Sequence, residues 1–403
     1  MIPCPRVEDI TEADIQRLVE HGAREDRMLE FKRELDLSRD GKQEVAEDAC
    51  AFANAFGGDL VFGLEAFDKR EGDSAVARAI APVRVPNLDA TLLDLVNSLR
   101  DSLEPQLATL HAHPVPLAAG GHVIVLRVGP SPSAPHRVVR RGGGHFYLRN
   151  SVGKEAMDIH AIRSAFAFSD GLGKRALAFR DERLAQILDN AVAAPLPQMR
   201  PRVIVHVVPV TSLTRHDAHT VEELKAAAQH FQQLAPLGEP LRAPRVNYEG
   251  VICTGHPNAA NESEAYAQLF RDGRIELGGI LTTGDIGDPP MPTLHPAQFE
   301  APLARQGLPA IARALATLGV PAPVYLMITL HRWGAATLTV CQPGTRYVEH
   351  RPLPAHLTFI QSPLVYIEDF DRPIAELIGA VLDPLWNAVG IDHTQTNFGE
   401  AAQ

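Results

Sequence analysis

Apolar residues in the first part of the chain recur with two different periods. A spacing of three to four residues is typical of a helix with one buried face, and short apolar runs bounded by turn residues are typical of strands. The pattern Thr11-Glu-Ala-Asp14 is a capping box, which predicts a short helix through about Glu20. Further helices are expected over 42–56, 88–103 and 157–168, and strands over 28–35, 59–64, 107–115, 122–128, 136–140 and 145–149.

The second half of the chain shows the same mixture after the proline-rich stretch 194–201. Strands are expected over 203–210, 250–254, 265–281 and 357–367, a hairpin over 324–333 and 336–341, and helices over 172–192, 222–234, 302–318 and 373–389. We therefore predict an α+β fold with three parts. These are an N-terminal domain over 1–170, a helical and proline-rich connector over 171–200, and a second domain over 201–403.

Composition narrows the class of protein without choosing a function. The chain has 403 residues, 45% hydrophobic and 22% charged, which is ordinary globular usage and excludes a mainly disordered chain. No apolar run approaches ~18 residues, and the first residues carry acids where a signal peptide needs basic ones, so we expect a cytoplasmic protein with no membrane partner. The net charge of −11 counts against a protein that coats DNA non-specifically. Four scattered cysteines form neither a disulfide framework nor a zinc site.

Three acids of the first domain are candidate metal ligands. Glu25 and Glu30 flank the start of an expected strand, and Glu65 follows the buried strand 59–64. Carboxylate oxygens are the ligands that Mg²⁺ and Mn²⁺ prefer, and such an ion activates water and stabilises a leaving oxygen. Lys32 lies two residues beyond Glu30, on the same strand face, and suits contact with a phosphate. The alternative is that these acids simply face solvent.

Arginines gather on the expected hairpin that follows residue 135. They could follow the backbone of RNA or DNA, or they could protect the edge of a sheet by their charge. The glycines at 57 and 58 are expected to serve the turn from helix to strand, with a phosphate-binding nest as the alternative. The candidate nucleic-acid-binding residues are Arg137, Arg140, Arg141 and Arg149.

Several of these segments together resemble the Schlafen-type AlbA-like domain. The segment 25–32 (EDRMLEFK) is similar to its E-S-x-x-x-E-F-K pattern, and 51–58 (AFANAFGG) to its A-F-A-N-x-x-G-G block. The following DLVFGLE resembles its strand ending in an acid, and 145–149 (HFYLR) its terminal Y-x-R strand. The blocks occur in the family's order over about residues 20–168.

The resemblance implies a function in nucleic-acid processing. Family members include metal-dependent endoribonucleases acting on transfer and ribosomal RNA, in which three acids at the positions of Glu25, Glu30 and Glu65 form the site. Asp26 stands where the family has serine, and Glu65 where it has aspartate. Those nucleases pair two such lobes, so a single lobe here implies a homodimer. A role in stress or antiphage defence fits the family.

We therefore expect a metal-dependent endoribonuclease that acts on structured RNA such as tRNA, with Mg²⁺ or Mn²⁺ as its ion. Glu25, Glu30 and Glu65 would hold the metal, and Lys32 would contact phosphate. Two other classes of function remain open at this point. One is a non-catalytic DNA- or RNA-binding regulator of transcription, and the other is a module for protein interaction or assembly with no nucleic-acid partner.

Overall fold

The protein is described by a computed structural model in which the chain folds into two units, Met1–Leu172 and Gly173–Gln403. Both units combine helices with sheets, and the predicted α+β class is confirmed. Among the described residues, no helix is long and apolar enough to cross a membrane. The structure describes all residues except 5, 68–74, 108–109, 132, 141–142, 151–152, 199, 215–217, 282–283, 287–290, 332–336, 342–347, 369, 371–373, 397 and 399–403.

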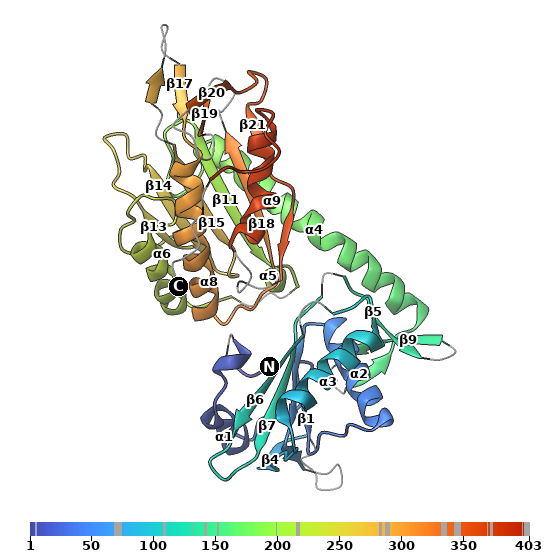
Figure 1. Ribbon diagram of the computed structural model, residues 1–403. Helices are drawn as coiled ribbons and strands as arrows, with labels where there is room; N and C mark the ends of the chain where they lie inside the picture. The colour runs from blue at the N-terminus through green and yellow to red at the C-terminus, as the bar shows by residue number, and fades with distance from the viewer. Residues whose placement is uncertain are drawn as a thin grey trace. The chain divides into compact units, whose positions relative to one another are not determined.

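The first unit is built on a four-stranded sheet in the order β1-β2-β7-β6 (Figure 1). β1 (Leu29–Lys32) runs parallel to β2 (Gly58–Phe62), with Lys32 opposite Phe62. β7 (His122–Val128) lies antiparallel to both β2 and β6 (Leu110–Pro116). Successive side chains of a strand point to opposite faces, so the sheet has two apolar faces and forms two cores.

Helices cover both faces of this sheet. α2 (Arg39–Ala53) and α3 (Leu88–Ser102) share one core with the strands, and α1 (Glu12–Glu20) contributes to the other. The predicted capping box is present, because the Asp14 carboxylate accepts a hydrogen bond from the backbone N–H of Thr11 at 2.8 Å. A 3₁₀ turn, η1 (Val7–Asp9), precedes α1.

A second sheet, in the order β10-β9-β8-β5, packs on α2, and all of its strand pairs are antiparallel. The predicted arginine-bearing hairpin corresponds to β8 and β9, which pair with Arg137 opposite Phe146. A two-stranded ribbon, β3-β4, completes the unit. The bounds are Leu64–Ala66 for β3, Ala77–Ile80 for β4, Leu103–Glu104 for β5, Arg137–Arg140 for β8, Gly143–Arg149 for β9 and Lys154–Ala156 for β10.

The turn between α2 and β2 requires its glycines. Gly57 adopts a φ of 73°, and a Cβ on Gly58 would lie 2.2 Å from the Phe52 ring. Asn54, at the end of α2, donates from Nδ2 to the carbonyls of His136 at 2.8 Å and Tyr147 at 2.9 Å. This block of sequence therefore fastens α2 to β8 and β9, which is the structural role expected of it.

The division between the units falls inside one long helix, α4 (Ile159–Leu188). Two separate helices, over 157–168 and 172–192, were predicted here, and that prediction is wrong. The helix continues through the glycines at 171 and 173, because a glycine inside a helix costs only about 1 kcal/mol relative to alanine, which a long helix tolerates.

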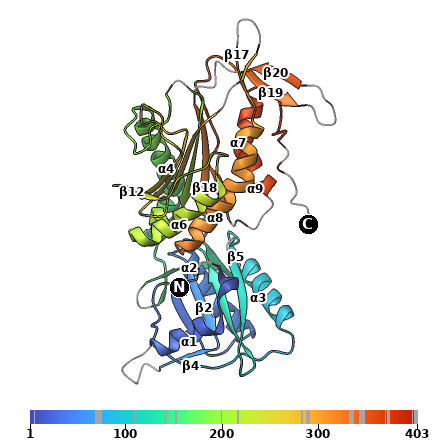
Figure 2. The ribbon, with the colours of Figure 1, turned by 90° about the vertical axis from the view of Figure 1, so that its left-hand side faces the viewer.

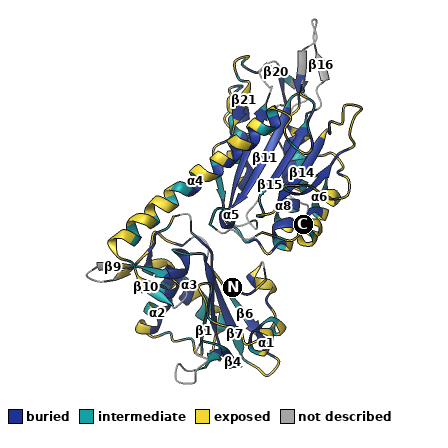
Figure 3. Ribbon diagram, turned by 180° about the vertical axis from the view of Figure 1, so that it is seen from behind, coloured by how far each residue is buried: buried dark blue, intermediate teal, exposed yellow. Residues whose placement is uncertain are grey.

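The second unit contains a large antiparallel sheet in the order β12-β13-β14-β15-β11-β18-β21, with β22 also paired to β18. Its central strands are buried (Figure 3). The bounds are Arg202–Pro209 for β11, Arg245–Val246 for β12, Gly250–Thr254 for β13, Ala265–Phe270 for β14, Ile275–Ile280 for β15, Val324–His331 for β18, Phe359–Gln361 for β21 and Val365–Ile367 for β22.

Helices cover both faces of this sheet as well (Figure 2). The C-terminal part of α4 packs on one face, through residues such as Leu184 and Ile187. α6, α8 and α9 pack on the other face. The bounds are Val210–Thr214 for α5, Val221–Leu234 for α6, Ala297–Pro302 for α7, Leu303–Gly307 for the π-helical turn η3, Leu308–Thr317 for α8 and Ile374–Asn387 for α9.

The second unit also contains a smaller sheet in the order β16-β17-β19-β20, which was not predicted. The segments 324–333 and 336–341 were predicted to form a hairpin, but β18 belongs to the large sheet and β19 pairs with β17 and β20. Adjacent strands usually pair, and here the chain passes from one sheet to another instead. The bounds are Gly284–Ile286 for β16, Met291–Leu294 for β17, Thr337–Cys341 for β19 and Val348–Pro352 for β20.

Candidate functional site

The alternation of β1 places Glu30 and Lys32 on one face of the sheet, as predicted. Leu29 and Phe31 are buried in the core that includes α1. Glu30 and Lys32 point the other way, where they contact α2 and β9. The site is therefore a cluster of charged side chains between β1, α2 and the β9-β10 hairpin.

Glu30 binds two cations within this cluster. Its Oε2 pairs with the guanidinium of Arg149, and its Oε1 lies 3.5 Å from Lys32 Nζ. Arg149 is only 5% exposed, stacks over the ring of Phe52 at 4.6 Å and donates to the carbonyl of Asp26 at 3.0 Å. The structure thus places Arg149 in the interior, where it holds Glu30, rather than on a surface open to a polynucleotide.

Lys32 is surrounded by carboxylates. Its Nζ lies 2.5 Å from Glu44 and 3.2 Å from Asp48, both on α2. Burial alone would lower the pKa of Lys32, but Asp48, Glu44 and Glu30 raise it well above its usual value. The ammonium therefore stays charged at neutral pH. It is half-buried and reaches the surface beside Glu30.

Glu25 lies next to Glu30, although the two are not bound to each other. Its Oε1 accepts a hydrogen bond from the backbone N–H of Phe31 at 3.0 Å. Burial and the neighbouring charge of Glu30 raise the pKa of Glu25. A carboxyl with a raised pKa beside a second carboxyl is one arrangement used for general acid and base chemistry.

Glu65 has a different neighbour. It lies on β3, where its Oε1 is 3.4 Å from Arg33 Nη1. Within the part of the chain that the structure describes, no three His, Cys, Asp or Glu side chains form a group that could hold a metal ion. The donor set of Glu25, Glu30 and Glu65, with Glu30 bound to Arg149 and Lys32, does not fit a three-carboxylate magnesium or manganese site in this arrangement.

Of the remaining arginines of the hairpin, the structure describes the side chain of Arg137 alone. Arg137 is exposed, and its Nη2 lies 2.6 Å from Glu104. Arg140 belongs to β8, but its side chain is outside the described residues, as is the whole of Arg141. His136, at the base of the hairpin, bonds to the carbonyl of Pro105 and to Ser131, and burial lowers its pKa. That pairing gives His136 a structural position.

The motif-based prediction missed four charged members of the cluster, which are Glu44, Glu47, Asp48 and Lys154. Asp48 is 1% exposed, and its Oδ1 lies 3.1 Å from Lys154 Nζ, which also lies 3.3 Å from Glu47. Burial raises the pKa of Asp48, while the two lysines oppose that shift. A signal existed in the sequence, because Asp48 shares a helical face with Val45 and Phe52, where an apolar residue is expected.

Comparisons with known proteins relate the first unit to a family. Residues 25–158 match the family model described as Schlafen, AlbA_2, which confirms the resemblance for that part of the chain and indicates a nucleic-acid-related function. A similar solved structure is the solution NMR structure of the N-terminal domain of a "putative ATP-dependent DNA helicase RecG-related protein" from Nitrosomonas europaea. It is 19% identical, covers 35% of this chain and 88% of that chain, and has a TM-score of 0.28. No curated protein matches the chain.

Proposed function

We propose that this protein, whose residues 25–158 belong to the Schlafen AlbA_2 domain family, binds nucleic acid through that unit and prefers RNA to DNA. The family match carries the proposal. It is supported by an exposed cation, Arg137, on the β8-β9 hairpin and by Lys32, which stays charged and lies at the surface beside Glu30. Binding to a polyanion by an acidic chain requires that accessible cations on one surface act together.

Salt dependence tests the binding step. Fluorescence anisotropy with labelled tRNA, single-stranded RNA and duplex DNA, between about 50 and 200 mM salt, should give affinities that fall as salt rises. Arg137→Ala should weaken binding and lower the slope of log affinity against log salt by about 0.7–0.9, the contribution of one phosphate contact. Arg313→Ala is the matched control, because Arg313 is an exposed arginine of the second unit.

The outcomes separate the classes of function. Affinity that does not change with salt, or equal slopes for Arg137→Ala and wild type, would contradict a phosphate-binding role for this hairpin. No measurable affinity for any of the three nucleic acids would leave a protein-interaction or assembly module as the better description. Binding without any cleavage would favour a non-catalytic regulator.

We further propose that the bound RNA is cleaved, with structured RNA such as tRNA as the substrate. The observation that favours this activity is the pair of neighbouring carboxylates, Glu25 and Glu30, beside Lys32. The described acids do not assemble a three-carboxylate metal site, so this proposal assigns no step to a metal ion. Mg²⁺ and Mn²⁺ are each added in the test below. The family nucleases pair two lobes of this kind, and a homodimer of this chain would supply the second one. Light scattering of the intact protein measures its oligomeric state.

The cleavage test compares three proteins. Total tRNA is incubated with wild type, Glu30→Gln and Glu34→Gln, each with Mg²⁺, with Mn²⁺ and with chelator. Glu30→Gln should lose cleavage by at least about 100-fold, the usual contribution of a general acid or base, and should keep tRNA binding. Glu34→Gln, an exposed acid of the same segment, should behave as wild type. Cleavage that survives in Glu30→Gln would end the assignment.

A further inference from the structure

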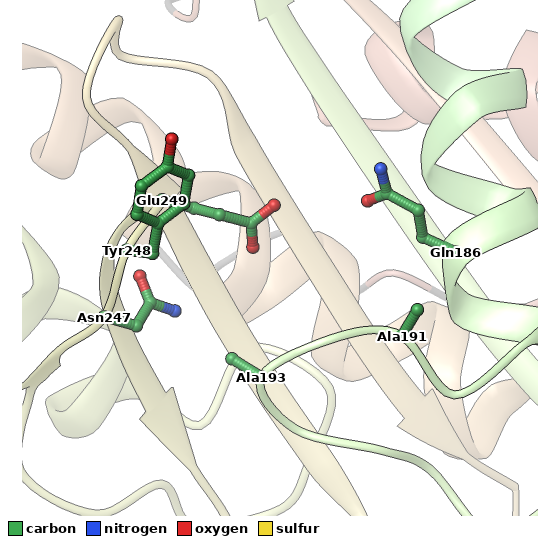
Figure 4. A pocket seen from close by; sticks show the side chains of 6 residues that line it. All are labelled: Gln186, Ala191, Ala193, Asn247, Tyr248 and Glu249. Carbon is green, nitrogen blue, oxygen red and sulfur yellow. The ribbon is translucent and has the colours of Figure 1, made fainter.

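The second unit contains a pocket lined by residues of α4 and of the loops that follow α4 and β12. It has a volume of about 350 Å³, within the size range of small-ligand sites. It opens between the end of α4 and the β12-β13 turn. Figure 4 shows the carboxylate of Glu249 pointing across the pocket toward Gln186, with the ring of Tyr248 beside it. The residues that line the pocket are Gln186, Ala191, Ala193, Asn247, Tyr248 and Glu249.

Two polar groups of the pocket are held in place by one buried arginine. Arg183 Nη1 donates to Gln186 Oε1 at 2.5 Å and pairs with Glu249 Oε1. The other side of the same guanidinium is fixed by the fully buried Glu276, through Nε at 2.9 Å and Nη2 at 3.0 Å. Because Gln186 accepts through its oxygen, its amide N–H₂ end is turned away from Arg183.

The buried end of this network is itself braced. Tyr266 donates its hydroxyl to Glu276 at 2.9 Å, and His206 Nε2 lies 3.1 Å from the same carboxylate. Tyr266, His206 and Glu276 belong to the large sheet and Arg183 to α4, so regular elements hold Arg183, which in turn fixes Glu249 in the β12-β13 turn. A binding site gains affinity when its polar groups are already fixed before the ligand arrives.

The chemistry of the pocket selects the class of ligand. Glu249 supplies an acceptor and Gln186 a donor, while Ala191 and Ala193 leave room for a flat ring. Tyr248 is 97% exposed, so its aromatic face is available for stacking at the mouth of the pocket. The charge of Arg183 is matched by Glu276 and Glu249, so the pocket offers no net positive charge to a phosphate.

We propose that this pocket binds a nucleobase that carries an exocyclic amino group. The amino group donates to Glu249, a ring nitrogen accepts from the Gln186 amide, and the ring stacks on Tyr248. Base-on-aromatic stacking is worth about 1–3 kcal/mol per base and tolerates any base, so the amino group provides the selectivity. The site binds free nucleosides. This proposal does not depend on whether the first unit binds RNA.

Calorimetry with the full-length protein tests this site. Adenosine should bind saturably, and purine riboside, which lacks the amino group, should bind more weakly. Tyr248→Ala should weaken adenosine binding by at least about fivefold, from the loss of stacking. Tyr248→Phe should retain it. Because Tyr248 is almost fully exposed, neither variant threatens the fold.

A second variant tests the carboxylate. Glu249→Gln should bring the affinities for adenosine and purine riboside close together, whereas Glu222→Gln, an exposed acid on α6, should leave the difference intact. The proposal is overturned if adenosine gives no saturable signal, if Tyr248→Ala binds it as wild type does, or if inorganic phosphate competes with it. Anisotropy with tRNA, run in parallel on the same variants, reports separately on the first unit.

Discussion

The two units each hold a Glu–Arg pair, but they surround it differently. In the first unit, Glu30 pairs with Arg149, keeps a 17% exposed side chain and also touches Lys32. In the second unit, Glu276 pairs with Arg183 and its side chain is 0% exposed. The same ionic chemistry is therefore open to solvent in one unit and sealed in the other.

This difference sets what each cluster can do. Burial alone would raise the pKa of Glu276, but hydrogen bonds from His206 and Arg183 lower it to about 2, so the carboxylate is ionised throughout the ordinary pH range. In the first unit, burial and Glu30 together raise the pKa of Glu25. A carboxyl with a raised pKa beside the half-buried Lys32 is the group that the proposed cleavage would use, while the sealed pair stabilises the large sheet.

Removing the cation from the sealed pair should have the largest effect. Arg183→Met leaves Glu276 charged and buried without its bidentate partner, which typically costs about 3–5 kcal/mol of unfolding free energy. Urea denaturation followed by circular dichroism measures the loss. The double variant Arg183→Met/Glu276→Leu should recover much of it, because no unpaired charge remains in the interior; Glu249, which also loses Arg183, has a side chain that is 29% exposed. Equal losses in the single and double variants would show that the pair itself, not the stranded charge, stabilises the unit.

Glu300 sharpens the comparison, because it is buried in the second unit and no arginine among the described residues pairs with it. It accepts from Trp386 Nε1 at 3.0 Å and Thr394 Oγ1 at 2.9 Å, and burial raises its pKa to about 7. Its ordinary value is 4.5, so between these two pH values the unfolded chain has lost a proton that the folded chain keeps. Stability should therefore fall by about 3 kcal/mol as pH rises from 4.5 to 7, and then level off.

Urea denaturation at a series of pH values measures this decline. Glu300→Gln should abolish most of it and should be more stable than wild type at pH 8, since the amide can still accept from Trp386 and carries no charge. Glu222→Gln removes an exposed charge of the same unit and should leave the decline unchanged. A Glu300→Gln protein with the wild-type pH profile would assign the decline to another group.

Removing the cation from the open pair should cost less. Arg149→Met leaves Glu30 with Lys32 at 3.5 Å and with partial access to water, and it removes the donor to the Asp26 carbonyl. We expect a loss of about 1.5–3 kcal/mol, the range for hydrogen bonds to charged groups, measured by the same urea series. A loss as large as that of Arg183→Met would mean that solvent does not reach this cluster.

Sequence patterns located most elements of the first unit because its helices and strands carry clear periods. The strand alternation of 29–32 also placed Glu30 and Lys32 on one face, as the structure has them. The partners were not predictable, since Arg149 lies 119 residues beyond Glu30 and its turn toward the interior depends on the packing of β9 against α2. In the second unit, Glu276 appears in a strand pattern that gives no sign of a buried arginine from α4.

The exposed pair on the hairpin should have the smallest effect on stability and therefore separates stability from binding. Arg137 and Glu104 are both well exposed, so water and salt screen their attraction and leave about 0–1 kcal/mol. Arg137→Met should leave the urea midpoint nearly unchanged, while tRNA affinity falls if this arginine contacts phosphate. Glu104→Gln, which removes the competing acid, should leave stability similar and strengthen tRNA binding. If both variants alter the urea midpoint but not tRNA affinity, the arginine on the hairpin protects the edge of a sheet. The exposed pair Arg137–Glu104 would then have a structural role, as the sealed pair Arg183–Glu276 does.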